Sequence, residues 1–333
     1  MKMSAPEKHT CIACGNAMYV FIDRIWDDRY GCPGVYTIER CTSCGQMATA
    51  PPLREQDLPA LYSTYYPRRE VDFDSLEREA AQVTAPFSKL KRWLNGTDNQ
   101  GHYFARPGQK VLDVGSGSCL SLLELRKMGI DACGIEADPN VRTIADRYDL
   151  RVYIGSIHDR PFVDEMFDLI VLNQVIEHVP EPQALLECVK DSLAPDGKFI
   201  LSFPNAGSWA RALSGVRWIN WHVPYHQHHF NKHSFELLAR RAGFRVVKVR
   251  TITPNLWTLL QIKALSEQPV EGQPSSSWSN GDGRSGRAGL SSRIKNALRR
   301  RLQKVLFMAV AALNRLVDVL GKGDSLLVEL RRN

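Results

Sequence analysis

A short apolar run that ends in a glycine-rich loop constrains the fold of this chain more than any other feature. Val111-Leu112-Asp113-Val114 precedes Gly115-Ser116-Gly117-Ser118, and a helical pattern follows from Cys119 to Met128. A strand, a glycine loop and a helix in this order are typical of the nucleotide-binding turn of an open α/β sheet. We therefore expect a ligand at the carboxyl ends of parallel strands.

The sequence around this loop alternates short apolar runs with helical patterns. Strands are predicted at 130–135, 151–154, 167–172, 198–203 and 244–251, and helices at 141–148 and 183–193. Alternating strands and helices imply right-handed crossovers. The fold class that follows is α/β, with a doubly wound parallel sheet.

Two kinds of nucleotide ligand compete for the glycine loop. A dinucleotide fingerprint requires a third small residue, and this chain has Leu120 there. The Asp113 carboxylate would repel a pyrophosphate but suits a ligand with an ammonium group. Glu136, at the end of the second strand, is placed to accept both ribose hydroxyls. These features indicate an adenosine ligand with a cationic amino-acid tail.

Five sequence blocks resemble those of the class I S-adenosylmethionine-dependent methyltransferases. The blocks are Val111–Gly117, Gly134–Glu136, Phe167–Ile170, Val175–Val179 and Leu193–Lys198. The resemblance covers residues 103–255 and a last strand at 324–330. It implies a Rossmann-like sheet closed by an antiparallel strand, an enzyme that transfers methyl groups, and S-adenosylmethionine as cofactor.

The predicted cofactor-binding residues lie in the loops that follow the strands. They are Asp113, Gly115, Ser116, Gly117, Glu136, Ala137, Ser156, Ile157, Asn173 and Gln174. Many relatives have Gly-Asp where this chain has Gly155-Ser156, so the adenine contacts are left to Ser156, Ile157 or His158. Asn173-Gln174 also departs from the Asn/Asp-Pro-Pro-Tyr/Phe of base amino methyltransferases, which argues against methylation of nucleobase amines.

Residues 222–233 contain five histidines. Pro224-x-His226-x-x-His229-Phe230 is similar to a subgroup of bacterial enzymes that methylate sugars, lipids or natural products. The similarity places His226 and His229 at the acceptor, and His178 is a third candidate for the general base. The alternatives are that the histidines shape a lid, that His178 packs at a helix start, or that His-x-x-His binds a metal. No carboxylate lies near that pair in the sequence.

Two C-x2-C pairs near the N-terminus are each followed by glycine. The four cysteines are Cys11, Cys14, Cys41 and Cys44. Four thiolates form a closed tetrahedral zinc site, so we expect a zinc ribbon over residues 1–62 with a structural ion. A redox function is the minor alternative, and the sequence leaves open whether the ribbon also binds a partner.

The remaining segments are a connector and an insertion. The connector, 63–102, is predicted to contain a helix over 72–95. Within the insertion, 256–322, residues 266–289 are typical of a flexible linker, and a basic amphipathic helix follows. Its apolar positions are Ile294, Leu298, Leu302, Val305, Leu306, Ala309, Leu313, Leu316, Val317 and Leu320. We expect residues 291–320 to bind an anionic membrane surface, with packing on the core or a partner, or RNA binding, as alternatives.

The net charge of this 333-residue chain is +7, and residues 284–304 hold eight cations and no carboxylate. The net positive charge of the chain thus comes from one segment, which disfavours nucleic acid as a partner. The start lacks a signal peptide and no long uncharged apolar stretch occurs. We therefore predict a cytoplasmic enzyme, or one peripheral at the inner face of the membrane. Its expected acceptor is a small molecule, sugar or lipid-linked glycan, methylated at oxygen, nitrogen or carbon. An RNA methyltransferase and a non-enzymatic scaffold are the alternatives.

Overall fold

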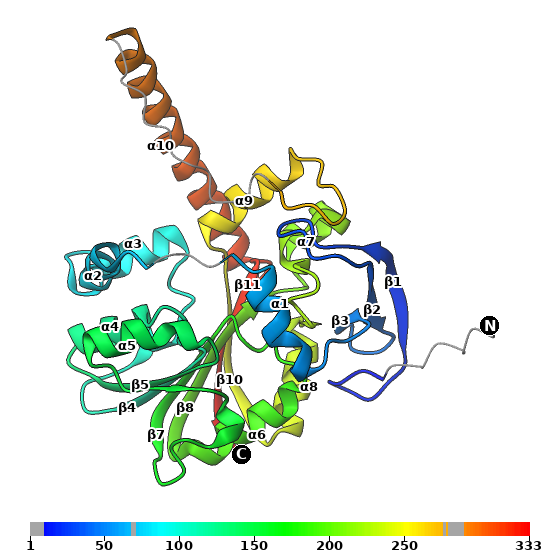
Figure 1. The fold of residues 1–333 in the computed structure, drawn as a ribbon, viewed down its shortest axis with the longest axis vertical. Helices are drawn as coiled ribbons and strands as arrows, with labels where there is room; N and C mark the ends of the chain where they lie inside the picture. The colour runs from blue at the N-terminus through cyan, green and yellow to red at the C-terminus, as the bar shows by residue number, and fades with distance from the viewer. Residues whose placement is uncertain (1–9, 68–70, 276–277, 279–289) are drawn as a thin grey trace.

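The chain folds around a seven-stranded sheet with a four-stranded sheet beside it (Figure 1). The structure is a computed structural model that describes residues 10–67, 71–275, 278 and 290–333. The strands of the large sheet are β4 (Lys110–Val114), β5 (Asp131–Glu136), β6 (Val152–Ile154), β7 (Phe167–Asn173), β8 (Leu193–Pro204), β10 (Phe244–Ile252) and β11 (Ser325–Arg332). Those of the small sheet are β1 (Met18–Ile25), β2 (Tyr36–Cys41), β3 (Met47–Ala50) and β9 (His228–His229).

The large sheet has the strand order β10-β11-β8-β7-β4-β5-β6. β4 to β8 pair in parallel, and β11 lies antiparallel between β8 and β10. The predicted doubly wound sheet with an antiparallel last strand is therefore confirmed. The strand order reverses between β4 and β7, which is where ligands bind in open α/β sheets.

Helices cover both faces of the large sheet, so its central strands are apolar on both sides. The four residues Leu169 to Leu172 of β7 are each at most 1% exposed. The α-helices are α1 (Leu58–Thr64), α2 (Phe73–Ala81), α3 (Ser88–Asn95), α4 (Leu120–Lys127), α5 (Arg142–Tyr148), α6 (Pro182–Ser192), α7 (Trp209–Ser214), α8 (Lys232–Arg241), α9 (Asn255–Leu265) and α10 (Leu290–Val319). One face packs against α2, α4 and α5, and the other against α6 and α8 (Figure 1).

The single helix expected over 72–95 is two helices, α2 and α3. Ala85 has extended backbone (φ −66°, ψ 150°), which is the conformation that a following proline imposes. Phe87 then adopts a left-handed φ of 59° at the start of α3. Leu76 and Ala80 of α2 are buried against α4, so this connector covers one face of the sheet.

The small sheet joins the N-terminal residues to the loops of the large sheet. Its strand β9 lies between β8 and α8 in the chain and pairs with β3. Two further contacts support this union: Asn231 Nδ2 donates to the carbonyl of Cys44, and an Arg241 guanidinium nitrogen to that of Ile12, each at 3.1 Å. The ribbon predicted over 1–62 is thus completed by a strand from the second half of the chain.

The insertion begins with α9, which the sequence analysis did not predict. In the predicted linker, residues 266–275 contact the small sheet: Ser275 N–H donates to the carbonyl of Arg29 at 2.8 Å. Residues 276–277 and 279–289 of that linker lie outside the described residues.

Helix α10 extends away from the body of the molecule (Figure 1). Its side chains are described from residue 303 onward, so predicted apolar positions 294, 298 and 302 are not among them. Val310, Ala311 and Val317 are buried. Among the described residues, no helix has the length and apolar character needed to cross a membrane.

Candidate active site

The glycine loop after β4 brings the backbone close to the position of a ligand. Gly115 has a φ of +78°, and a Cβ there would lie 2.4 Å from Cγ2 of Val175. Gly117 has a φ of +52°, and a Cβ there would meet nothing within 4 Å. Glycine is therefore required at Gly115 by space and conformation, whereas Gly117 faces an open side of the loop.

Asp113 is a buried carboxylate with an unused acceptor atom. Its side chain is 2% exposed, Ser121 Oγ donates to Oδ2, and Oδ1 has no partner among the described residues. Burial raises the pKa of Asp113. Oγ of the neighbouring Ser116 is likewise buried and unpartnered. A ligand with a positively charged ammonium group would supply the missing partner, so these residues fit S-adenosylmethionine.

Glu136 lies across the loop from Gly117. Its Oε2 accepts the Gly117 N–H at 2.7 Å, and its Oε1 accepts the Asp138 N–H at 3.0 Å. A carboxylate has about four lone-pair positions, so Glu136 retains acceptor capacity for ribose hydroxyls. The neighbouring Ala137 is exposed. The structure thus places both predicted residues at the rim of the glycine loop.

The loop after β6 supplies its own carboxylate, which sequence reasoning missed. Asp159 Oδ2 accepts the Ser156 N–H at 2.8 Å, and Ser156 Oγ accepts the His158 N–H at 3.2 Å. Ile157 is 4% exposed. The capping box Ser156-x-x-Asp159 was the available signal. Because Asp159 holds its own loop together, it is not a free substitute for the missing adenine-binding carboxylate.

Asn173 and Gln174 support the end of β7 by hydrogen bonding to neighbouring chain segments. Asn173 Oδ1 accepts the Gly101 N–H at 2.8 Å. Gln174 has a left-handed φ of 56°, and its amide donates to Ser202 Oγ at 3.2 Å. Non-glycine residues seldom adopt this conformation, and they do so mostly where function demands it. Both side chains thus tie the end of β7 to neighbouring segments.

A cluster of three potential ligands lies just beyond β7. Atoms of Glu177, His178 and His226 all lie within 4.8 Å of one another. Glu177 is 1% exposed, and both carboxylate oxygens lack a partner among the described residues. Burial raises the pKa of Glu177 to about 8 and lowers that of His178 to about 4. The fold thus supplies the carboxylate that is absent from the sequence around the histidines.

Backbone carbonyls define which ring nitrogens of the two histidines carry protons. His178 Nδ1 lies 3.0 Å from the carbonyl of Tyr225, and His226 Nδ1 lies 2.9 Å from that of Asn220. A carbonyl only accepts hydrogen bonds, so each Nδ1 carries the proton. Each Nε2 is therefore left with a lone pair, which suits proton abstraction or binding of a cation.

Tyr62 connects this cluster to the cofactor side of the site. Its hydroxyl lies 2.9 Å from His178 Nδ1. Burial raises the pKa of Tyr62, and the nearby charges of Glu177 and Glu136 add to the effect. Tyr62 thus contacts the histidine cluster directly through His178. Sequence reasoning did not assign Tyr62 a function.

Three other histidines of the segment, His228, His229 and His233, are not part of this cluster. His229 is 2% exposed in β9, its Nε2 lies 3.3 Å from Thr49 Oγ1, and its ring packs on Trp221. His228 Nε2 lies 3.1 Å from the carbonyl of Pro180. His233 is exposed on α8. The structure therefore brings His178 and His226 together but places His229 at the contact with the small sheet.

The four predicted zinc ligands converge in the small sheet. Their sulfur atoms all lie within 4.8 Å of one another, with Cys11–Cys44 at 3.5 Å and Cys14–Cys41 at 3.4 Å. Sulfur atoms around one zinc ion at Zn–S distances of about 2.3 Å are spaced similarly. Gly15 and Gly45 both have positive φ, as the predicted turns require.

A buried hydrogen-bonded pair, His102 and Glu124, was missed by sequence reasoning. His102 Nε2 lies 2.6 Å from Glu124 Oε2, and both side chains are at most 6% exposed. A positive charge on His102 would lower the pKa of Asp113, against the larger effect of burial. The partners are 22 residues apart and share no motif, so only the fold reveals that they lie near Asp113.

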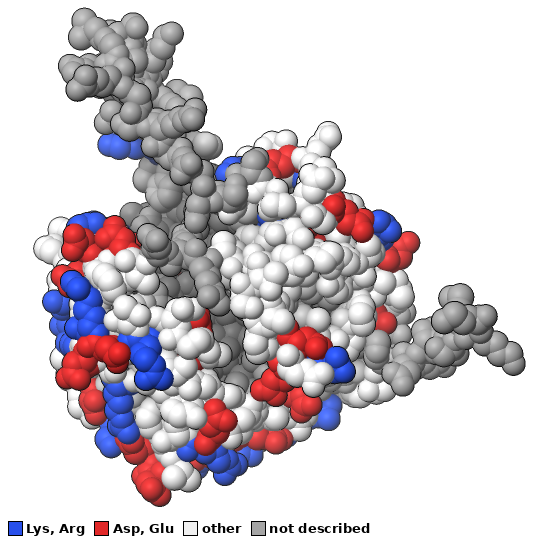
Figure 2. Space-filling view, viewed as in Figure 1, with Lys and Arg blue, Asp and Glu red and all other residues white. Residues whose placement is uncertain are grey.

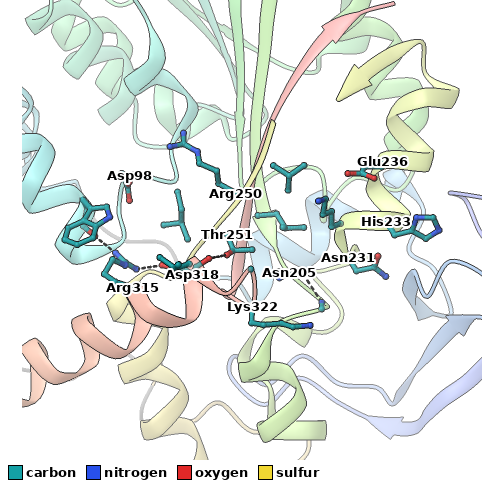
Figure 3. Close-up of a pocket in the computed structure, with 18 residues that line it drawn as sticks. Asp98, Asn205, Asn231, His233, Glu236, Arg250, Thr251, Arg315, Asp318 and Lys322 are labelled. Carbon is teal, nitrogen blue, oxygen red and sulfur yellow. Dashed lines mark hydrogen bonds and ion pairs between the residues drawn. The ribbon is translucent and has the colours of Figure 1, made fainter. Parts of the chain in front are cut away.

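A groove among the described residues lies elsewhere, along the edge strand β10 (Figure 3). Its volume is about 820 Å³, and its lining includes Asn205, Arg250, Asp318 and Lys322. None of the residues predicted to bind cofactor or acceptor lines it. On the face shown in Figure 2, basic and acidic side chains alternate without a continuous basic surface among the described residues. That face does not resemble a nucleic-acid footprint.

Comparison with known proteins identifies the family. A methyltransferase domain family matches residues 82–249, which is half of the chain. Together with the strand order and the glycine loop, this match shows that the chain belongs to the class I S-adenosylmethionine-dependent methyltransferases.

Two relatives are named ubiquinone biosynthesis O-methyltransferase. The protein of Paramagnetospirillum magneticum is 35% identical over 150 residues, which are 42% of this chain and 60% of the relative. That of Cereibacter sphaeroides is 30% identical over 165 residues, which are 45% of this chain and 67% of the relative. The matches thus span about two thirds of the relatives and less than half of this chain.

Solved structures resemble the fold at low sequence identity. A methyltransferase from Archaeoglobus fulgidus is 14% identical with a TM-score of 0.43, covering 78% of this chain and 100% of that one. The [4+2]-cyclase SpnF is 15% identical with a TM-score of 0.47, covering 85% and 98%. These scores are below 0.5 and add nothing to what the strand order establishes.

Proposed function

We propose that the protein transfers the methyl group of S-adenosylmethionine to an oxygen atom of a small-molecule acceptor. The unpartnered, buried carboxylate oxygen of Asp113 under the glycine loop carries the cofactor assignment. The names of the relatives favour oxygen over nitrogen or carbon as the methylated atom. A sugar or lipid-linked glycan of cell-surface polysaccharide or natural-product synthesis is the narrower proposal, which rests on the sequence resemblance.

The residues divide between cofactor binding and acceptor activation. Asp113, Ser116 and the glycine loop would hold the amino-acid part of the cofactor, and Glu136 its ribose. When bound, S-adenosylmethionine supplies an electrophilic methyl group for an in-line displacement, so the protein must align the acceptor and remove its proton. We propose that this occurs at the Glu177, His178 and His226 cluster, where each Nε2 has a lone pair. We assign His229 a structural function in the small sheet.

Labelled-methyl transfer tests this function without knowledge of the acceptor. The purified protein is incubated with methyl-labelled cofactor and extracts of the source cells, and the labelled product is identified. We expect a small molecule labelled at oxygen. A protein that binds S-adenosylmethionine but labels nothing would contradict the enzyme and leave the scaffold alternative. Labelled RNA would favour the RNA alternative.

His226→Asn is expected to lower kcat by about 100-fold or more, because general acid–base catalysis typically contributes that much. The affinity for S-adenosylmethionine should stay unchanged, since His226 lies on the acceptor side. His233→Asn is the matched control, because His233 is exposed in the same segment. Equal kcat values for H226N and wild type would refute the assignment; the measurement uses the labelled-methyl assay and calorimetric cofactor binding.

We propose that the four clustered cysteines bind a structural zinc ion. The spacing of their sulfur atoms and the absence of an open ligand position in a four-thiolate site support this. The division into a ribbon at 1–62, a connector, a core and an insertion is likewise a proposal, in which the ribbon acts as a support for the histidine segment.

We propose that α10 contacts an anionic membrane surface through its exposed apolar side. Val305, Leu316 and Leu320 are 70%, 58% and 66% exposed and recur at helical spacing, away from the buried Val310 and Ala311. The sequence adds six cations and no carboxylate between 291 and 304. Such a helix gains apolar burial and charge attraction at an anionic interface.

Val305→Gln with Leu316→Gln is expected to reduce sedimentation with anionic phospholipid vesicles by about tenfold, because two buried apolar side chains are lost. Leu213→Gln, on α7 and 75% exposed, is the matched control. Substitution is preferable to deletion, because Asp318 accepts the Thr253 N–H at 3.1 Å and anchors α10 to the core. Equal binding of all three proteins would exclude this surface.

A further inference from the structure

The Glu177, His178 and His226 cluster has the composition of a cation site. Two imidazoles and one carboxylate converge within 4.8 Å. Divalent first-row metal ions such as Mn²⁺, Co²⁺ and Zn²⁺ accept this donor set and retain open positions for further ligands. Neutral imidazoles with a free Nε2 are already in the form that binds a metal ion.

Unpartnered polar atoms surround the same position. Glu177 is 1% exposed, yet neither of its carboxylate oxygens has a partner among the described residues. His222 Nε2 and Tyr225 Oη are also buried without partners. The His222 ring lies 4.8 Å from the rings of both His226 and Tyr225, centroid to centroid. A buried carboxylate is unfavourable without a compensating charge, and a cation with its remaining ligands would satisfy these groups together.

The outer contacts of both histidines match those of metal ligands. A ligating histidine normally donates its second ring N–H to a backbone carbonyl or a carboxylate, which orients the ring. His178 Nδ1 does so to Tyr225 at 3.0 Å, and His226 Nδ1 to Asn220 at 2.9 Å. Both rings are thus held in place, and Nε2 of each is the ring nitrogen that remains to bind a cation.

We propose that Glu177, His178 and His226 bind one divalent cation, and that the acceptor oxygen completes its coordination. The inference rests on the proposed methyl transfer to oxygen. A cation makes a coordinated hydroxyl more acidic, so the acceptor O–H proton passes to water rather than to a histidine. The oxygen–methyl bond then forms as the methyl–sulfur bond of S-adenosylmethionine breaks. The two histidines are then ligands, and the bound cation takes over the activation of the acceptor that a histidine base would provide without it.

Titration with Co²⁺ tests the site directly on the full chain with zinc retained in the cysteine cluster. Bound Co²⁺ is measured by equilibrium dialysis and by visible absorption. We expect one Co²⁺ per chain without thiolate charge-transfer bands. Glu177→Gln and His226→Gln should each weaken binding at least 10- to 100-fold, whereas the exposed control His233→Gln should bind as the wild type does.

Two results would overturn the cation site. One is uptake of Co²⁺ only with thiolate charge-transfer absorption, and the other is equal affinity in E177Q and wild type. Calorimetry with S-adenosylmethionine shows whether each variant keeps its folded cofactor side. Because the titration needs neither acceptor nor turnover, a failed labelled-methyl assay would contradict the proposed function without deciding the cation site.

Discussion

Asp113→Asn is expected to weaken S-adenosylmethionine binding by about 10- to 100-fold, which corresponds to the free energy that a hydrogen bond to a charged group contributes. The substitution preserves shape and removes the carboxylate charge that would face the ammonium group. In the cofactor-free protein it should raise the melting temperature. Burial raises the pKa of Asp113, so at neutral pH the wild type must either keep a proton or bury a charge, and asparagine does neither.

The pH dependence separates this effect from ordinary packing. The folded protein holds the Asp113 proton at pH values where the unfolded chain has released it, so rising pH above about 4 favours unfolding. The advantage of D113N should thus appear as the pH rises and vanish in acid. Asp131→Asn is the matched control, exposed at the start of β5. Scanning calorimetry measures the melting temperature, and titration calorimetry measures the affinity for S-adenosylmethionine. Undiminished cofactor binding by D113N would refute the assignment of Asp113 to the cofactor site.

Cys41→Ser with Cys44→Ser is expected to remove about one zinc ion per chain and to lower methyl transfer at least tenfold, while cofactor affinity stays unchanged. Zinc binding supplies much of the folding free energy of small ribbons. Here β3 pairs with β9, and Asn231 donates to the Cys44 carbonyl. Loss of the ribbon should therefore displace the segment that carries His226.

Cys32→Ser is the matched control, because Cys32 lies between the two cysteine pairs and is buried outside the sulfur cluster. Zinc content, near-ultraviolet circular dichroism of the tryptophans and the labelled-methyl assay provide the readouts. Full activity in a zinc-free double variant would show that the ribbon does not support the acceptor site.

The glycine loop and the strands around it were largely predictable because their signals are local. One strand–loop–helix–strand stretch contains the strand, Gly115, Gly117 and Glu136. Within such a short stretch, backbone conformation and residue spacing determine which groups can contact a ligand. The cysteine pairs were predictable for the same reason. Gln174 shows the limit: its left-handed backbone directs the amide to Ser202, and no local pattern indicates this.

The acceptor side could not be predicted because its residues meet only through long-range contacts. His229 follows the same sequence pattern as His226, yet β-pairing with β3 places it against Thr49. The apolar positions of α10 likewise predicted a helix but not its buried side, which Val310 and Ala311 define.

By itself the sequence determined the sheet, the glycine loop, the nature of the cofactor and the convergence of four cysteines, since each depends on residues close together in the chain. Only the tertiary structure decided that Glu177 meets His178 and His226, and that the histidine segment pairs with the cysteine-containing sheet. Glu177 lies after β7, His226 in the segment after β8, and the ribbon at the N-terminus. The packing of these segments leaves the Glu177 carboxylate buried and without a partner among the described residues, and a buried group of this kind is where chemistry is expected.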